Sequence, residues 1–215
     1  NSSISGETID YGPCAFMDGY RPDQVFSSID AHGRYAWNEQ PNIAVWNLAQ
    51  LASCLVPLMG NDDAAVAEAT RIVHGFPVLY QAEWLRVFGA KLGIAQPRPE
   101  DRELIEHLLS LMAAERADFT RVFAGLSDGT ARDEFIDREA WDRWSRDWQD
   151  RIGGDGQAAQ VMARANPRRI PRNHRIEQAI AAARDEGDFT LFHRLDGALR
   201  APFDERPEWA DLAQA

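Results

Sequence analysis

Lysine is almost missing from this sequence. Lys91 is the only one, so arginine carries nearly all of the positive charge. No glycine-rich loop ending in Lys-Ser or Lys-Thr is present, which excludes a phosphate-binding loop of the Walker type. If the protein handles a nucleotide, a phosphate-binding lysine has to come from outside this sequence.

Cysteines and long apolar runs are also scarce. Cys14 and Cys54 lack the spacing of metal ligands and follow no apolar signal segment, so we interpret both as free thiols that pack in the core of a protein from a reducing compartment. The arginine- and alanine-rich composition suggests the bacterial cytoplasm. No apolar run approaches the roughly 18 residues that span a bilayer, so we expect no membrane partner. A net charge of −11 repels a phosphate backbone, so we expect no nucleic-acid partner.

Strand signals are nearly absent after residue 40, where apolar residues recur at helical spacing. The exception is the amino end, where Ile4 and Ile9 flank a turn at Ser5 and Gly6 and predict a small β-hairpin. The sequence therefore predicts a mostly α fold with one short hairpin at its amino end. Prolines, glycines and capping acids predict helices over residues 41–59, 62–73, 77–92, 99–112, 118–123, 137–152, 157–165, 173–186 and 188–200.

Two helical segments allow more than one interpretation. Trp141, Trp144 and Trp148 lie on one side of their predicted helix, where they could stack bases, but such a stripe is typical of a core face. The run RANPRRIPRNHR could bind phosphate or a partner. Neutralisation of carboxylates explains it equally well, and we expect it to dock the last helices. The histidines lack metal-ligand spacing, so no zinc site is predicted.

The opening NSSISGETIDYGP contains candidate metal ligands. Asn1 and Asp10 offer hard oxygen atoms of the kind Mg²⁺ prefers, and a hairpin could bring both to one ion. In isolation such residues more often cap backbone groups. The continuation Tyr11-Gly12-Pro13 favours the metal site, because protein kinases place an Asp-aromatic-glycine sequence at their second metal ligand, with an asparagine ligand upstream.

Ordered blocks along the whole chain resemble the selenoprotein O family. They are NSSISGETIDYGPCAFMD, HGRYAWNEQPNIAVWNLAQLA, RDEFIDREAW, NPRRIPRNHRIEQAI, GDFTLFHRL and LRAPF. The resemblance implies the helical carboxyl-terminal lobe of a protein-kinase-like fold. It also implies an enzyme that transfers AMP from ATP to Ser, Thr or Tyr hydroxyls of proteins, with Asn1 and Asp10 holding Mg²⁺ or Mn²⁺ and Asp10 positioning ATP through the metal.

The resemblance also predicts an organisation. Residues 1–36 would form the metal-binding hairpin and DYG loop, and residues 37–215 the helical lobe, as one structural unit. The family's catalytic base would stand immediately before Asn1, and its glycine-rich segment and phosphate-binding lysine further upstream. We therefore expect this helical lobe to pair with a missing amino-terminal lobe. We also expect the fragment given by this sequence to be inactive in isolation. The alternative is a non-catalytic, all-helical protein-interaction domain.

The family's redox control looks absent. Some members carry a regulatory cysteine soon after DYGP, where this chain has Phe26, and a second cysteine or selenocysteine at the carboxyl end, where it reads DLAQA. The resemblance therefore predicts no redox regulation through that pair.

Overall fold

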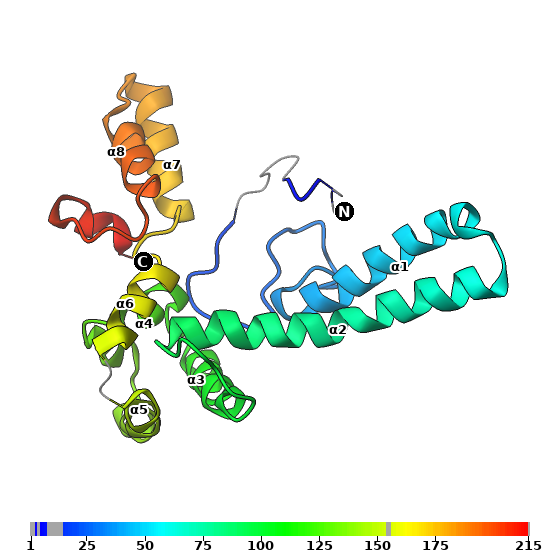
Figure 1. Ribbon diagram of the computed structural model, residues 1–215. Helices are drawn as coiled ribbons and strands as arrows, with labels where there is room; N and C mark the ends of the chain where they lie inside the picture. Colours follow the sequence, from blue (N-terminus) through cyan, green and yellow to red (C-terminus); the bar gives the residue numbers. More distant parts are fainter. Residues whose placement is uncertain (1–2, 4, 8–14, 154–155, 215) are drawn as a thin grey trace. The chain divides into compact units, whose positions relative to one another are not determined.

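The computed structural model describes residues 3, 5–7, 15–153 and 156–214 and is mostly helical (Figure 1). The chain divides into two compact units. The first contains residues 1–14 and 22–84, and the second contains residues 15–21 and 85–215. The described residues contain no β-strand, and the predicted strands around Ile4 and Ile9 fall largely on residues outside the described part. The β-hairpin and the kinase-like architecture therefore remain predictions.

The first unit is built on two long helices. The short η1 (Trp37–Glu39) leads into α1 (Gln40–Met59), and Pro41 stands in its first turn, where a proline costs no hydrogen bond. Gly60 ends α1 with a positive φ of 129°. The Asp62 carboxylate then accepts a hydrogen bond from the backbone N–H of Ala65 at the start of α2.

The helix α2 (Asp63–Lys91) is longer than predicted. The sequence predicted two helices separated before Pro77, and the structure has one continuous helix with Pro77 inside it. That prediction is wrong because the inward-facing residues recur at the same helical spacing on both sides of the proline. The stripe continues at helical spacing through Ala65, Ala69, Val73, Phe76, Tyr80 and Trp84.

The second unit consists of short helices. They are α3 (Asp101–Glu115), α4 (Phe119–Gly125), η2 (Thr130–Glu134), α5 (Arg138–Ile152), α6 (Gly156–Ala165), α7 (Asn173–Ala181), the π-helical η3 (Ala182–Glu186), α8 (Thr190–Leu199) and η4 (Pro207–Ala213). The predicted caps Asp118 and Asp137 are confirmed, whereas Asp188, predicted to cap α8, stands one residue before the N-cap position, which Phe189 occupies. Asp118 accepts from the N–H of Arg121 and Asp137 from that of Ala140, both at the first turn of a helix, and Gly153 ends α5.

The tryptophan stripe of α5 lies in the core of this unit. Trp141, Trp144 and Trp148 are all buried. The indole N–H of Trp144 donates to the carbonyl of Leu104 at 2.9 Å, and that of Trp148 donates to the carbonyl of Leu92 at 2.8 Å. The interpretation as a core face is therefore confirmed, and base stacking by these rings is excluded.

The carboxyl-terminal helices are held by the arginine run. α7 and α8 lie side by side (Figure 1), and a small apolar cluster that includes Leu195 and Leu212 joins them to η4. The buried Arg169 donates to the backbone carbonyls of Asp204 at 2.7 Å and Trp209 at 3.3 Å. The prediction that this run docks the last helices is confirmed.

One helical stretch bears on the expectation that the protein has no membrane partner. Residues Trp37–Met59 are long and apolar enough, by length and composition, to cross a bilayer, with a mean hydropathy of 1.3. The sequence analysis sought an unbroken apolar run, whereas this criterion tolerates scattered Asn, Gln and Ser. Length and composition alone do not assign a helix to a membrane, so the expectation of no membrane partner stays a prediction. None of this stretch is buried.

Candidate functional site: the segment that follows DYGP

The two predicted metal ligands, Asn1 and Asp10, lie outside the described residues. Between them the structure describes a turn, in which the N–H of Gly6 donates to the carbonyl of Ser3 at 3.2 Å and Gly6 has a positive φ of 73°. This is the turn predicted at Ser5 and Gly6. No group of three or more metal-binding side chains occurs among the residues that are described.

The segment directly after DYGP is fixed to the second unit. The N–H of Phe119 donates to the carbonyl of Asp18 at 2.8 Å, and the N–H of Tyr20 donates to the carbonyl of Ala117 at 2.9 Å. Gly19 forms an antiparallel bridge with Asp118 between these two bonds. A Cβ at Gly19 would lie 2.7 Å from the carbonyl oxygen of Arg116, so only glycine permits this approach.

A buried arginine completes this attachment. Arg172 is 1% exposed, and its Nη1 donates to Asp18 Oδ1 and, at 2.7 Å, to Asp118 Oδ2. We call Asp18, Asp118 and Arg172 the arginine clamp. Burial acts to lower the pKa of the Arg172 guanidinium, but the hydrogen bonds and charges of the two carboxylates outweigh it and raise that pKa.

The clamp joins three distant parts of the chain. Asp18 stands eight residues after Asp10, Asp118 caps α4, and Arg172 stands directly before α7. Sequence reasoning found Asp118 as a cap and Arg172 within the arginine run, but it missed Asp18. No local signal marks Asp18, because its partner is 154 positions away.

Lys91 is partly buried in the second unit, where its ammonium group bonds to protein atoms. Its Nζ donates to the carbonyl of Ala165 at 3.2 Å and to Asn166 Oδ1 at 3.4 Å, and it lies over the rings of Phe119 and Phe123. Burial lowers its pKa from 10.5 to about 8. Lys91 therefore joins the end of α2 to the end of α6.

The first unit contains a cavity of about 870 Å³ between the loop at residues 26–35 and the first half of α1. The Asp30 carboxylate shapes this loop by accepting from the N–H of Arg34 at 2.8 Å and of Tyr35 at 2.7 Å. Phe26, which stands where the family resemblance places a regulatory cysteine, is one of the lining residues.

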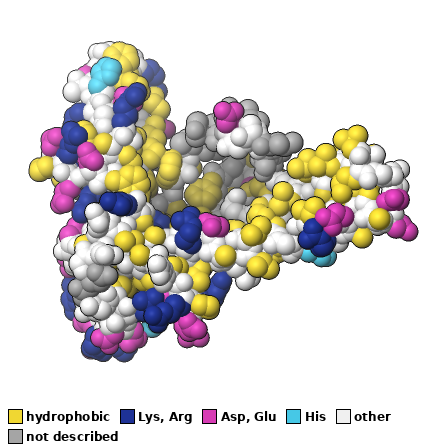
Figure 2. All heavy atoms as spheres, in the orientation of Figure 1, with side chains coloured by type: hydrophobic (Ala, Val, Ile, Leu, Met, Phe, Trp, Pro, Cys, Tyr) yellow, Lys and Arg dark blue, Asp and Glu magenta, His cyan; other side chains and the backbone are white. Residues whose placement is uncertain are grey.

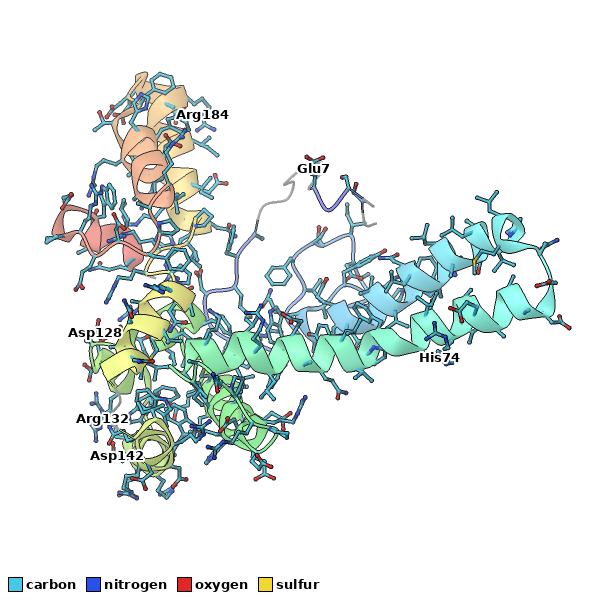
Figure 3. The ribbon with its side chains drawn as sticks, in the orientation of Figure 1. Glu7, His74, Asp128, Arg132, Asp142 and Arg184 are labelled. Carbon is cyan, nitrogen blue, oxygen red and sulfur yellow. The ribbon has the colours of Figure 1, made fainter. Side chains whose placement is uncertain are left out.

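The second unit contains a cavity of about 570 Å³ with charged walls. Its charges compensate one another: Arg121 pairs with Glu134 at 2.6 Å, and Arg168 pairs with Asp128 at 3.0 Å. Arg168 and Asp128 join the arginine run to the turn before η2 (Figure 3 labels Asp128). Within the run, Arg168 and Arg172 pair with carboxylates, which confirms the interpretation of neutralisation for these two residues.

Comparison with known proteins gives one consistent family. The family model described as "Protein adenylyltransferase SelO" matches residues 1–200. The chain is similar to proteins named "Protein nucleotidyltransferase YdiU": it is 55% identical over 212 residues to that of Ruegeria sp. strain TM1040 and 54% identical over 214 residues to that of Ruegeria pomeroyi. A third relative, from Rhizobium etli, is 46% identical over 224 residues.

The matches cover nearly all of this chain but less than half of the relatives. The shares are 99%, 100% and 98% of this chain, and 45% of each of the three relatives. The chain thus spans about half the length of the curated relatives it matches.

Proposed function

Since the chain belongs to the SelO family, we propose that it is the metal-binding and helical part of an ATP-dependent protein adenylyltransferase. The full-length enzyme transfers AMP from ATP to Ser, Thr or Tyr hydroxyls of other proteins. The observation that carries the proposal is the family match over residues 1–200, which includes the DYGP block with Asn1 and Asp10.

The proposed reaction requires anionic and polar oxygen atoms that fit a divalent cation. The Asn1 amide and the Asp10 carboxylate provide hard oxygen donors, which suit Mg²⁺ or Mn²⁺. When bound, such a cation offsets the charge that develops as the acceptor hydroxyl attacks the α-phosphorus and pyrophosphate leaves. Asp10 supplies the anionic ligand and Asn1 the neutral one.

The arginine clamp supports the proposed metal-binding role because it fixes a residue close in sequence to Asp10. Phosphoryl-group transfer depends on holding the ligands of the cation within a small distance of their productive geometry. Asp18 is fixed to α4 and to Arg172 eight residues beyond Asp10, so the chain that leaves the metal site is attached to the helical core at its first described stretch. Asp18 therefore gives the chain a fixed point eight residues after Asp10.

The test is the full-length enzyme carrying Asp10→Ala. Removing the only carboxylate of the ligand pair is expected to lower AMP transfer to an acceptor protein by at least a hundredfold, because the neutral amide that remains holds a divalent cation far more weakly than the pair does. The matched control is Glu7→Gln, which removes an exposed carboxylate from the same segment (Figure 3) and is expected to leave transfer unchanged. AMP transfer retained by the Asp10→Ala enzyme would contradict the assignment.

The second candidate function is a non-catalytic helical domain that binds a protein partner. The observation that favours it is the large apolar surface that the first unit exposes. The same experiment separates the two functions, since an interaction domain predicts no AMP transfer by the full-length wild-type protein either.

A further inference from the structure

The helix α1 has the composition of a buried helix but is not buried. Its 20 residues, QPNIAVWNLAQLASCLVPLM, include no charged side chain, and none of them is buried. A helix on the surface of a water-soluble domain normally carries charged residues on its outer face, whereas one that is apolar on all sides is enclosed by protein or lipid. The first unit therefore does not itself cover α1.

The adjoining part of α2 extends this surface. Leu58 is 84% exposed, Val78 71% and Leu79 67%, although each belongs to a residue type that is usually buried. Figure 2 shows hydrophobic side chains along both helices. We call this exposed set the hairpin patch; its members are Leu55, Leu58, Met59, Val66, Ile72, Val78 and Leu79.

The two helices leave space even between themselves. A cavity of about 240 Å³ is lined by small residues of α1, among them Ala49 and Ala52, and by residues of α2 such as Val73. Cys54, which the sequence predicted to be in the core, is exposed on α1, so that prediction is wrong for this chain. The sequence has the pattern of a core helix, and the missing component is the other side of the core.

We propose that the hairpin patch is the docking surface for the remainder of the full-length polypeptide. This chain accounts for 45% of the length of its relatives, so more than half of the full-length protein is available to cover the patch. The inference rests on family membership and on length, and it holds whatever reaction the protein catalyses.

The chemistry of the patch favours polypeptide over lipid. A bilayer-spanning α1 would bring the tip of the hairpin, with Asp62 and Asp63, to the far side of the membrane and return it through α2. α2 carries the exposed ion pair of Glu68 and Arg71, at 2.7 Å, within the same stretch as the patch. Charged groups at such positions are costly in a bilayer and ordinary at the rim of a protein contact.

Cys54 offers a direct probe of the proposal in the full-length protein. We would measure alkylation of individual cysteines by mass spectrometry of peptides, which separates Cys54 from Cys14. Ser110→Cys, on an exposed polar position of α3, is the accessible control. The proposal predicts that Cys54 reacts at least tenfold more slowly than the control cysteine in the folded protein, and at the same rate in denaturant.

The other occupants give different results in the same assay. Protection that disappears on dilution, together with a dimer in sedimentation, would assign the patch to a second copy and overturn the proposal. Protection seen only after adding phosphatidylcholine and phosphatidylglycerol vesicles would assign it to a membrane and overturn it as well. If Cys54 reacted as fast as the control cysteine under all conditions, the patch would be uncovered and the proposal would be overturned.

A pair of substitutions tests the patch by its energetics. Leu58→Gln and Leu79→Gln keep helix propensity nearly constant while placing an amide on the surface. In the full-length protein each is expected to lower the Tm by several degrees, because a buried unpaired amide is costly. The control is Ile136→Gln, at an apolar residue outside the patch that is 90% exposed. Equal melting temperatures for all three variants would contradict the proposal.

Discussion

At the scale of single residues, the second unit contains a buried charged side chain, Arg172. Arg172 and Asp118 are both buried and bond to each other, and each also binds a second group, Asp18 for the arginine and the α4 N-terminus for the aspartate. Burying one ion alone is far more costly than burying a matched pair. The clamp is therefore sensitive to the loss of any one member.

Arg172→Met should destabilise the chain by about 3–5 kcal/mol, because it leaves the buried Asp118 carboxylate without its partner. Urea unfolding followed by tryptophan fluorescence measures this loss, since Trp141, Trp144 and Trp148 lie in the same unit. A double variant with Asp118→Asn should recover part of it.

The control for this substitution is Arg184→Met. Arg184 forms a solvent-exposed ion pair with the neighbouring Asp185, so no measurable change is expected. If both methionine variants unfolded at the same urea concentration, the clamp would not have the energetic role assigned to it.

At the scale of helices, the sequence was most informative where one local rule acted alone. Asp118 and Asp137 were identifiable as caps because a cap depends on the next three residues only. Pro77 misled because two local rules conflicted. Proline favours the start of a helix, yet the inward stripe from Ala65 to Trp84 continued through it and decided the outcome.

The junction between α2 and α6 should respond to pH through Lys91. Its pKa is lowered from 10.5 to about 8 by burial, so the folded state releases this proton more readily than the unfolded state does. Below pH 8 both states are protonated and the cost of burying the charge is constant. Between pH 8 and 10.5 the folded state is neutral at Lys91, so the free energy of unfolding gains a favourable contribution as the pH rises.

Lys91→Met isolates this contribution. Urea unfolding of wild type and variant at pH 7.5 and pH 10 should show the wild type gaining on the order of 2–3 kcal/mol relative to the variant. The variant also loses the hydrogen bonds to Ala165 and Asn166, which shifts its stability at both pH values alike. Parallel behaviour of the two proteins across this range would show that Lys91 does not change its protonation there.

At the scale of the whole molecule, the family was accessible from sequence because it depends on ordered blocks, and the family match over residues 1–200 confirms the resemblance. The packing was less accessible. Nothing near Asp18 indicates that it meets Arg172, and nothing in α1 indicates that its apolar surface is uncovered in this chain. Long-range contacts and missing partners leave no periodic signal.

The central claim is that the full-length protein transfers AMP and that Asn1 and Asp10 belong to its metal site. The most direct measurement incubates the full-length protein and an acceptor protein with Mg²⁺ and ATP labelled either at the α-phosphate or at the γ-phosphate. The account predicts that the acceptor gains label from the α-phosphate only, and that Asp10→Ala abolishes this gain. Transfer of the γ-phosphate label, or no transfer of either, would contradict it.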